Sequence, residues 1–215
     1  MRILCVSDEV DPLVYSARIR DRFGDVDMVL AAGDLPLEYL EFVASMLNRP
    51  LLYVEGNHDL GSLGTTATWG YGYDFKRSFG ARNMNFRFAR EAGLSILGLP
   101  GSMAYNRGPN QYSEFSMGLR ILLLAPRLLL ERILRGRAVD IVLTHAPPRG
   151  IHDRDDRCHW GFVVYRHLMR LAKPRWFIHG HVHLYDLTET RSTLEGETTV
   201  VNAFGHWIID TGPTP

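Results

Sequence analysis

Five short apolar runs, each followed at once by polar residues, dominate the pattern of this chain. The runs are Ile3 to Val6, Met28 to Ala32, Leu51 to Val54, Ile141 to Leu143 and Trp176 to Ile178. Continuous apolar runs of this length are typical of strands that are buried on both faces. The pattern therefore predicts five buried strands.

Three segments between these runs have helical patterns. Apolar residues share one helical face between Leu37 and Leu47. A second helix is expected from about Leu119 to Arg135, irregular near Pro126. A third should span Phe162 to Leu171 and end before Pro174. Strands that alternate with helices predict parallel strands joined by crossovers.

Four later runs are richer in residues that suit hairpin strands. They are Asn85 to Arg90, Ser95 to Leu99, Thr198 to Asn202 and Trp207 to Asp210. These runs suggest a second, mixed sheet beside the parallel strands. Since the chain contains no internal repeat and no linker-like stretch, we expect residues 1–215 to form a single domain with two packed sheets and helices outside.

Composition narrows the classes of function. The chain has 24 basic and 24 acidic residues, so a surface that binds nucleic acid without sequence preference is not expected, nor is attraction to a membrane. Its two cysteines, Cys5 and Cys158, imply no disulfide framework. The apolar run near the N-terminus is too short for a signal peptide. We therefore expect a soluble cytoplasmic protein.

The end of each buried-strand run delivers a side chain that can bind a metal ion. These side chains are Asp8, Asp34, Asn57, His145, His181 and His183. Carboxyl ends of parallel strands meet at one edge of a sheet, so these groups can converge. Mixed oxygen and imidazole ligands suit Mn²⁺, Fe or Zn²⁺. They outnumber the needs of one tetrahedral ion, which favours two ions that share a carboxylate.

The motifs around these residues resemble those of the calcineurin-like metallophosphoesterase family. They are Ser7-Asp8, Ala32-Gly33-Asp34, Gly56-Asn57-His58-Asp59, Thr144-His145-Ala146-Pro147-Pro148 and Gly180-His181-Val182-His183. The motifs fall in the family's order and span nearly the whole chain. The resemblance implies an α/β fold, a four-layer αββα sandwich of two mixed sheets flanked by helices.

The resemblance also implies a role for each motif residue. Asp8 and His183 would hold a first metal ion, Asp34 would bridge two ions, and Asn57, His145 and His181 would hold the second. His58 would protonate the leaving oxygen, and Asp59 is a candidate to orient His58. The cofactors would then be two divalent ions, Mn²⁺ in preference to Fe or Zn²⁺, and a hydroxide that bridges them would attack phosphorus.

The substrate is less defined than the reaction. A phosphodiester, a phosphomonoester, a nucleotide and a phosphoprotein all remain open as substrates, with a weak preference for a small phosphodiester. Gly33-Asp34-Leu35-Pro36 lacks the second Asp of phosphoprotein phosphatases, which lowers that option. Arg107, Arg149 and His159 lie on long loops and are candidates to bind the substrate, although Arg on a loop is usually only solvated.

One position departs from the family pattern. The first motif is normally Asp-x-His, but here it reads Asp8-Glu9-Val10, so the first ion loses an imidazole. Water, Asp11 or His159 could fill the gap. A catalytically weak or inactive binding module, like the retromer subunit with this fold, is therefore the alternative function. The retained His58 and the intact second set of ligands favour the enzyme.

Overall fold

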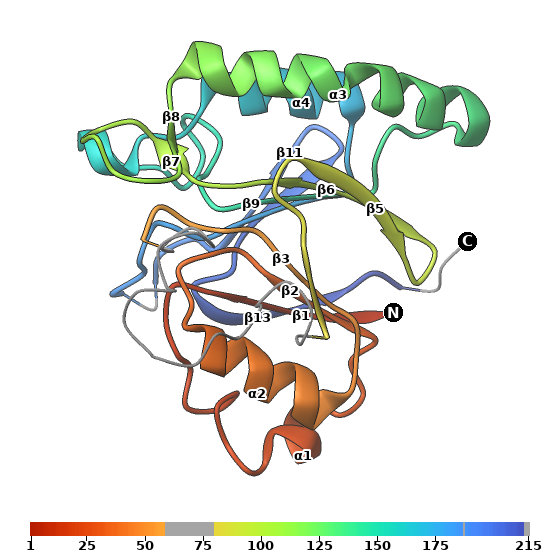
Figure 1. Ribbon diagram of the computed structural model, residues 1–215, viewed down its shortest axis with the longest axis vertical. Helices are drawn as coiled ribbons and strands as arrows, with labels where there is room; N and C mark the ends of the chain where they lie inside the picture. Colours follow the sequence, from red (N-terminus) through yellow and green to blue (C-terminus); the bar gives the residue numbers. More distant parts are fainter. Residues whose placement is uncertain (59–79, 187, 213–215) are drawn as a thin grey trace, which may run out of the picture.

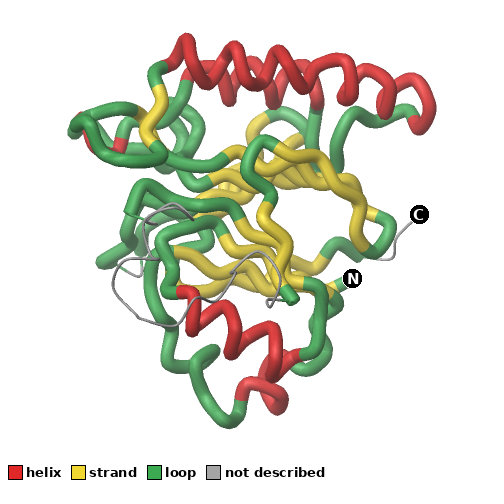
Figure 2. The backbone as a smooth tube through the Cα atoms, viewed as in Figure 1, coloured by secondary structure: helices red, strands yellow, loops and turns green. Residues whose placement is uncertain are grey.

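Two mixed β-sheets lie face to face, and helices cover the outer surface of each sheet (Figures 1 and 2). A computed structural model describes residues 1–58, 80–186 and 188–212 of the chain. The predicted αββα sandwich is confirmed. Within the described residues, no helix combines the length and the apolar character that crossing a membrane would require.

The first sheet has the strand order β13-β1-β2-β3-β4. Its strands are β13 (Gly205–Asp210), β1 (Arg2–Ser7), β2 (Met28–Ala31), β3 (Leu51–Tyr53) and β4 (Ala81–Asn83). Strands β1 to β4 are parallel, and β13 runs antiparallel to β1. Helices α1 (Ile19–Phe23) and α2 (Leu37–Leu47) pack on its outer face through a buried apolar cluster.

The second sheet has the order β11-β12-β10-β9-β6-β5. Its strands are β11 (Ser192–Glu195), β12 (Thr198–Asn202), β10 (Trp176–His179), β9 (Ile141–Thr144), β6 (Leu94–Leu99) and β5 (Arg87–Glu91). The four central strands are parallel, and both edge strands are antiparallel. Helices α3 (Glu114–Arg135) and α4 (Val163–Ala172) cover its outer face.

Short elements complete the loops beside this sheet. Strands β7 (Ser102–Met103) and β8 (Gln111–Tyr112) pair with each other, and a 3₁₀ turn, η2 (Arg157–His159), lies near β7.

The predicted grouping of strands was wrong. The five buried strands do not share one sheet, because β1, β2 and β3 lie in the first sheet whereas β9 and β10 lie in the second. Strand β13, expected in the second sheet, returns to the first and places Ile209 opposite Ile3. Apolar periodicity identifies buried strands, but it does not say which strand pairs with which.

Helix α3 is longer and more regular than expected. It begins at Glu114, where the Ser113 side chain accepts a hydrogen bond from the backbone N–H of Ser116, and it continues through Pro126 without a break. Pro126 leaves the carbonyl of Leu122 without its helical donor. Leu122 is exposed, so water can satisfy that carbonyl.

The inner faces of the two sheets share one apolar core. Ile3, Met28 and Leu52 come from the first sheet, and Ile141 and Ile178 come from the second. Each of these side chains is at most 1% exposed. Because this core joins the sheets directly, it holds the loops at the ends of both sheets in a constant relation.

Ile178→Ala should lower the free energy of unfolding by about 2–5 kcal/mol, because it removes buried methylene groups from between the sheets. Urea denaturation measures the change. Leu194→Ala is the control: Leu194 is 72% exposed on β11, so this change should stay within about 0.5 kcal/mol. Equal effects at the two positions would contradict a core shared by the sheets.

Candidate metal centre

Tight turns at the strand ends carry the predicted ligands. Asp8 follows β1, Asp34 lies just beyond β2, and His181 lies just beyond β10, with φ values of 64°, 55° and 67°. Residues other than glycine rarely adopt this left-handed backbone conformation. Those that do are often found at functional sites. The strained turns direct all three residues toward the same edge of the two sheets.

Nε2 of His145 and three other potential ligand atoms form a compact group. Nε2 lies 3.3 Å from Oδ2 of Asp34, 3.1 Å from Oδ1 of Asn57 and 3.1 Å from Nδ1 of His181. His145 is completely buried, and Asn57 and His181 nearly so. Such a compact set of oxygen and imidazole nitrogen atoms fits a divalent cation such as Mn²⁺, Fe²⁺ or Zn²⁺.

Hydrogen bonds on the outer side of each ligand fix its orientation. Nδ1 of His145 donates to the Ala32 carbonyl at 2.7 Å, and Nε2 of His181 donates to the Cys158 carbonyl at 2.6 Å. Nδ2 of Asn57 donates to the hydroxyl of Tyr105 at 3.2 Å. Each of these hydrogen bonds leaves the other polar atom of the side chain facing the cluster. Hydrogen-bond partners outside the ligand shell orient the ligands of metal sites in the same way.

The other predicted pair, Asp8 and His183, is more loosely arranged. Both carboxylate oxygens of Asp8 accept from the backbone N–H of His181, at 3.0 and 2.9 Å. Nε2 of His183 is 3.9 Å from Oδ1 of Asp8, and the His183 side chain is 42% exposed. The structure therefore brings together all six predicted ligands, but the cluster around His145 is much tighter.

Glycines make this close approach possible at two points. A Cβ atom on Gly56 would overlap the carboxylate of Asp34, and one on Gly180 would overlap Ser7 and Asp8. Larger residues would therefore push the ligand side chains away from one another.

The charges of the tight cluster favour a proton on His145. Burial opposes ionisation of Asp34, but His145 and the N–H of His58 outweigh it and lower the pKa of Asp34 to about 2. Burial likewise opposes the charge on His145, but Asp34 and Asp8 raise the pKa of His145 to about 9. Burial and then His145 lower the pKa of His181 to about 3. Burial raises the pKa of Asp8.

The predicted acid, His58, lies beside Asp34. The backbone N–H of His58 donates to Oδ1 of Asp34 at 2.8 Å, and the His58 side chain is exposed. Asp59, its predicted orienting partner, lies outside the described residues.

Of the candidate substrate residues, only His159 lies against the cluster. Its ring is 5.3 Å from the ring of His181, and its Nδ1 is 2.7 Å from Asp156. Arg149 instead stacks on Trp160, with 4.7 Å from its guanidinium to the ring centre. Arg107 is exposed on its loop.

Two loop residues at the centre were not predicted from the sequence. Tyr105 contacts Asn57, as described above, and Arg154 donates to the carbonyl of His183 at 2.6 Å and approaches Glu189 at 3.3 Å. Tyr105 stands in a long loop with a second Tyr, and Arg154 stands in a long loop with two other Arg residues, so the sequence alone distinguishes no single position in either loop.

The structure also locates the candidates for the missing imidazole ligand. Val10 is 36% exposed. Asp11 is paired with His206, since its Oδ2 lies 2.5 Å from Nδ1 of that residue. Asp11 is therefore engaged elsewhere, and His159 lies on the His181 side of the centre.

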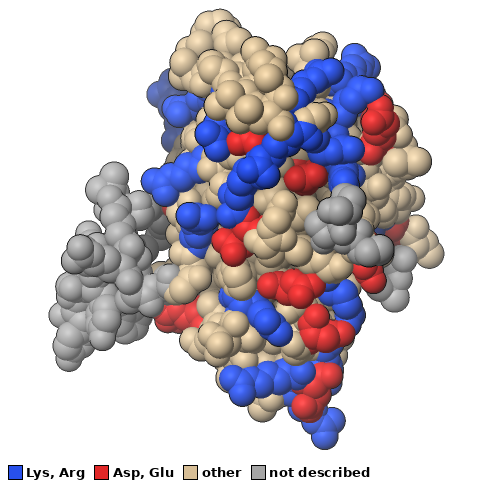
Figure 3. All heavy atoms as spheres, turned by 90° about the vertical axis from the view of Figure 1, so that its right-hand side faces the viewer, with Lys and Arg blue, Asp and Glu red and all other residues tan. Residues whose placement is uncertain are grey.

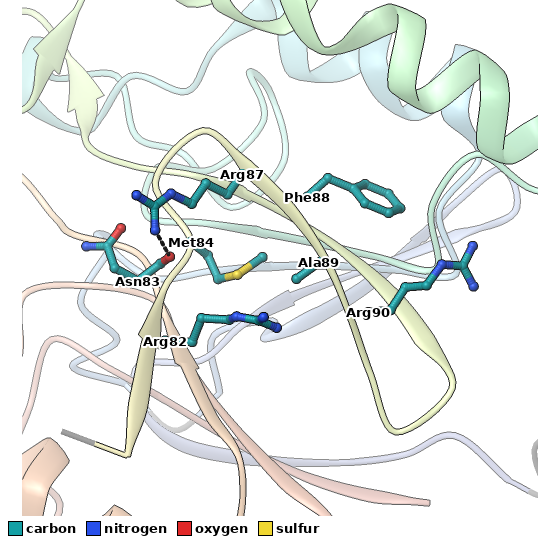
Figure 4. Close-up of a pocket in the computed structure, with 7 residues that line it drawn as sticks. All are labelled: Arg82, Asn83, Met84, Arg87, Phe88, Ala89 and Arg90. Carbon is teal, nitrogen blue, oxygen red and sulfur yellow. Dashed lines mark hydrogen bonds between the residues drawn. The ribbon is translucent and has the colours of Figure 1, made fainter. Parts of the chain in front are cut away.

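A separate pocket lies between β4 and β5, the edge strands of the two sheets (Figure 4). Arg82, Arg87 and Arg90 line it. Arg90 pairs with Glu131, and Arg87 donates to the Asn83 carbonyl. None of its lining residues is a predicted ligand, so we assign the chemistry to the histidine cluster.

The calcineurin-like phosphoesterase family profile matches residues 1–185. The chain belongs to this family. Membership supports a metal-dependent phosphoesterase in general. No curated protein sequence matches the chain.

Solved structures are similar in fold at low sequence identity. The protein TT1561 of Thermus thermophilus is 16% identical with a TM-score of 0.60, covering 95% of this chain and 89% of its own. The phosphopantetheinyl hydrolase PptH of Mycobacterium tuberculosis is 13% identical with a TM-score of 0.53, covering 94% and 88%. A further structure reaches a TM-score of 0.66 at 15% identity, covering 97% and 94%. These likenesses show the fold alone.

Metal binding should strengthen with pH. His145 carries a proton below its pKa of about 9, and an incoming cation must displace that proton. Affinity for Zn²⁺ should therefore rise by roughly tenfold per pH unit between about pH 6 and about pH 8 if one proton leaves. Calorimetry in two buffers of different ionisation enthalpy measures the release. An affinity independent of pH would contradict the protonated state of His145.

Proposed function

We propose that the protein hydrolyses phosphate esters at the cluster around His145, with two divalent metal ions as cofactors. The observation that carries the proposal is the meeting of Asp34, Asn57 and His181 within 3.1–3.3 Å of one imidazole nitrogen. A fold needs no such buried polar cluster for stability, because burying these groups costs free energy unless a ligand or proton compensates them.

The residues divide between two ions. His145, His181 and Asn57 would hold the second ion, Asp8 and His183 would hold the first, and Asp34 would lie between them. The donor atoms suit Mn²⁺, Fe or Zn²⁺, and we propose Mn²⁺. When bound, such ions act as Lewis acids on phosphoryl oxygens and lower the pKa of a water molecule.

The protein's own groups would position the ester and move protons. His58 is exposed next to Asp34, where its imidazole can donate a proton to the leaving oxygen. Its proposed orienting partner is Asp59. His159, on the rim beside His181, can contact a substrate oxygen. We propose a small phosphorylated substrate, with a weak preference for a phosphodiester, and a cytoplasmic location.

The exposed Val10 and the looser pair of Asp8 and His183 favour one other candidate. A centre that holds its first ion weakly could serve as a binding module with little or no turnover. The intact second set of ligands and the exposed His58 are the reasons to prefer the enzyme.

Hydrolysis of p-nitrophenyl phosphate and of its bis-ester tests the proposal. After Mn²⁺ loading, the protein should contain close to two ions per chain and turn over one of these esters. His58→Ala should reduce turnover by about 10²–10⁴-fold, the range for removal of a general acid. Asn57→Ala should reduce both metal content and turnover.

The matched control is His167→Ala, an exposed histidine on α4, which should leave activity unchanged. Folded, metal-loaded protein that hydrolyses neither ester with Mn²⁺, Fe²⁺ or Zn²⁺ would favour the binding module instead.

Val10→His should restore the imidazole that the family pattern has at this position. Its first ion should bind at least about tenfold more tightly, a size of effect typical of changes around metal ligands. Titration with metal ions, monitored by calorimetry, measures the difference in affinity, with Val10→Leu as the control. If both variants titrate alike, position 10 does not face the centre.

A further inference from the structure

The outer face of α3 is a continuous apolar surface. Eight large side chains on this helix are 44–82% exposed: Phe115, Leu119, Leu122, Leu123, Leu129, Leu130, Ile133 and Leu134. At the helical period of about 3.6 residues per turn, these eight positions fall on one side of the helix. Contiguous apolar surface of this extent is rare on isolated proteins and marks an interaction site.

The opposite face of the same helix is apolar as well. Met117, Ile121 and Leu128 are buried against the second sheet and α4. A helix with two opposite apolar faces normally has both of them covered. Packing within the protein therefore explains the inner apolar face of α3 but not the outer one.

The charged side chains of the two outer helices are mainly positive. Helices α3 and α4 together carry six arginines and two glutamates. Glu131 is 3% exposed and pairs with Arg90, Arg127 and Arg135, and Glu114 accepts from the backbone at the start of α4. Arg166 is paired as well, with Glu195, and Arg132 donates to the Leu171 carbonyl, so the excess of positive charge is smaller than the count of arginines. Arg132 and Arg170 are exposed. Figure 3 shows an uncharged crest at the top of the molecule, bordered mainly by Lys and Arg, with Asp or Glu at its lower margin.

We propose that the outer face of α3 docks on an anionic lipid surface. Its apolar side chains would enter the boundary between headgroups and acyl chains, and the surrounding arginines would contact lipid phosphates. A second copy of the chain is less well matched, because a two-fold contact through α3 would bring the basic borders of both copies together. The zero net charge conceals this uneven distribution.

The docking face is separate from the metal centre. Helix α3 lies on the outer side of the second sheet, whereas the centre lies at the carboxyl ends of β1 and β10, at the edge between the layers (Figure 1). Docking through α3 therefore leaves the candidate centre uncovered.

Flotation of the full chain with lipid vesicles tests the proposal. The protein should float with mixed phosphatidylcholine and phosphatidylglycerol vesicles, much less with pure phosphatidylcholine, and less as salt is added. Leu122→Gln with Leu129→Gln should weaken this binding by about tenfold or more. Arg132→Gln with Arg170→Gln should weaken it by about tenfold.

Matched controls replace exposed leucines elsewhere: Leu13→Gln with Leu194→Gln should bind vesicles like the unmodified protein. All variants should retain the unmodified protein's circular dichroism, because the substituted side chains are exposed. Three results would overturn the proposal. They are an absence of flotation, equal binding to both vesicle types, and a dimer in light scattering that the α3 variant alone loses; the last would assign the face to a second copy.

Discussion

The apolar core between the two sheets is the constraint on which the candidate centre depends. Asp8, Asp34 and Asn57 follow strands of the first sheet, whereas His145 and His181 follow strands of the second. Among the described residues, no hydrogen-bonded ladder joins the two sheets, so side-chain packing sets the distance across them. The 3.3 Å separation of Asp34 and His145 therefore depends on how well that core is filled, together with the hydrogen bonds from His145 to the Ala32 carbonyl and from His181 to Asp8. A small shift of one sheet would open the cluster.

The same constraint explains why strained backbone is tolerated at the strand ends. Left-handed residues cost free energy, of order 1–3 kcal/mol each, and persist only where surrounding structure over-determines them. Here the carboxylate of Asp8 accepts the N–H of His181, itself left-handed, so each strained turn supports the other across the two sheets. The close approach leaves room for hydrogen at Gly180 but not for a methyl group.

Much of this arrangement was predictable from sequence, and the failures have identifiable causes. Buried strands and the polar side chains at their ends follow from local apolar runs, and the family motifs name six candidate ligands, which the structure brings together. The division of strands between sheets was not predictable, because β13 pairs with β1 across about the whole chain length. Tyr105 and Arg154 were missed since their roles depend on loop conformation, which has no periodic signal.

The two halves of the centre differ in how strongly the protein prepares them. Around His145, the imidazole and amide ligands each have an outer hydrogen-bond partner, and burial excludes water that would otherwise screen their charges. His183 is partly exposed, and its Nδ1 lies 3.2 Å from the hydroxyl of Tyr185, a side chain that is itself 81% exposed. Solvent can therefore compete for His183 in a way that it cannot for His145. Val10, where the family pattern has an imidazole, falls on the half that the fold holds less firmly. The proposed site of a first ion would therefore depend on groups that solvent can reach.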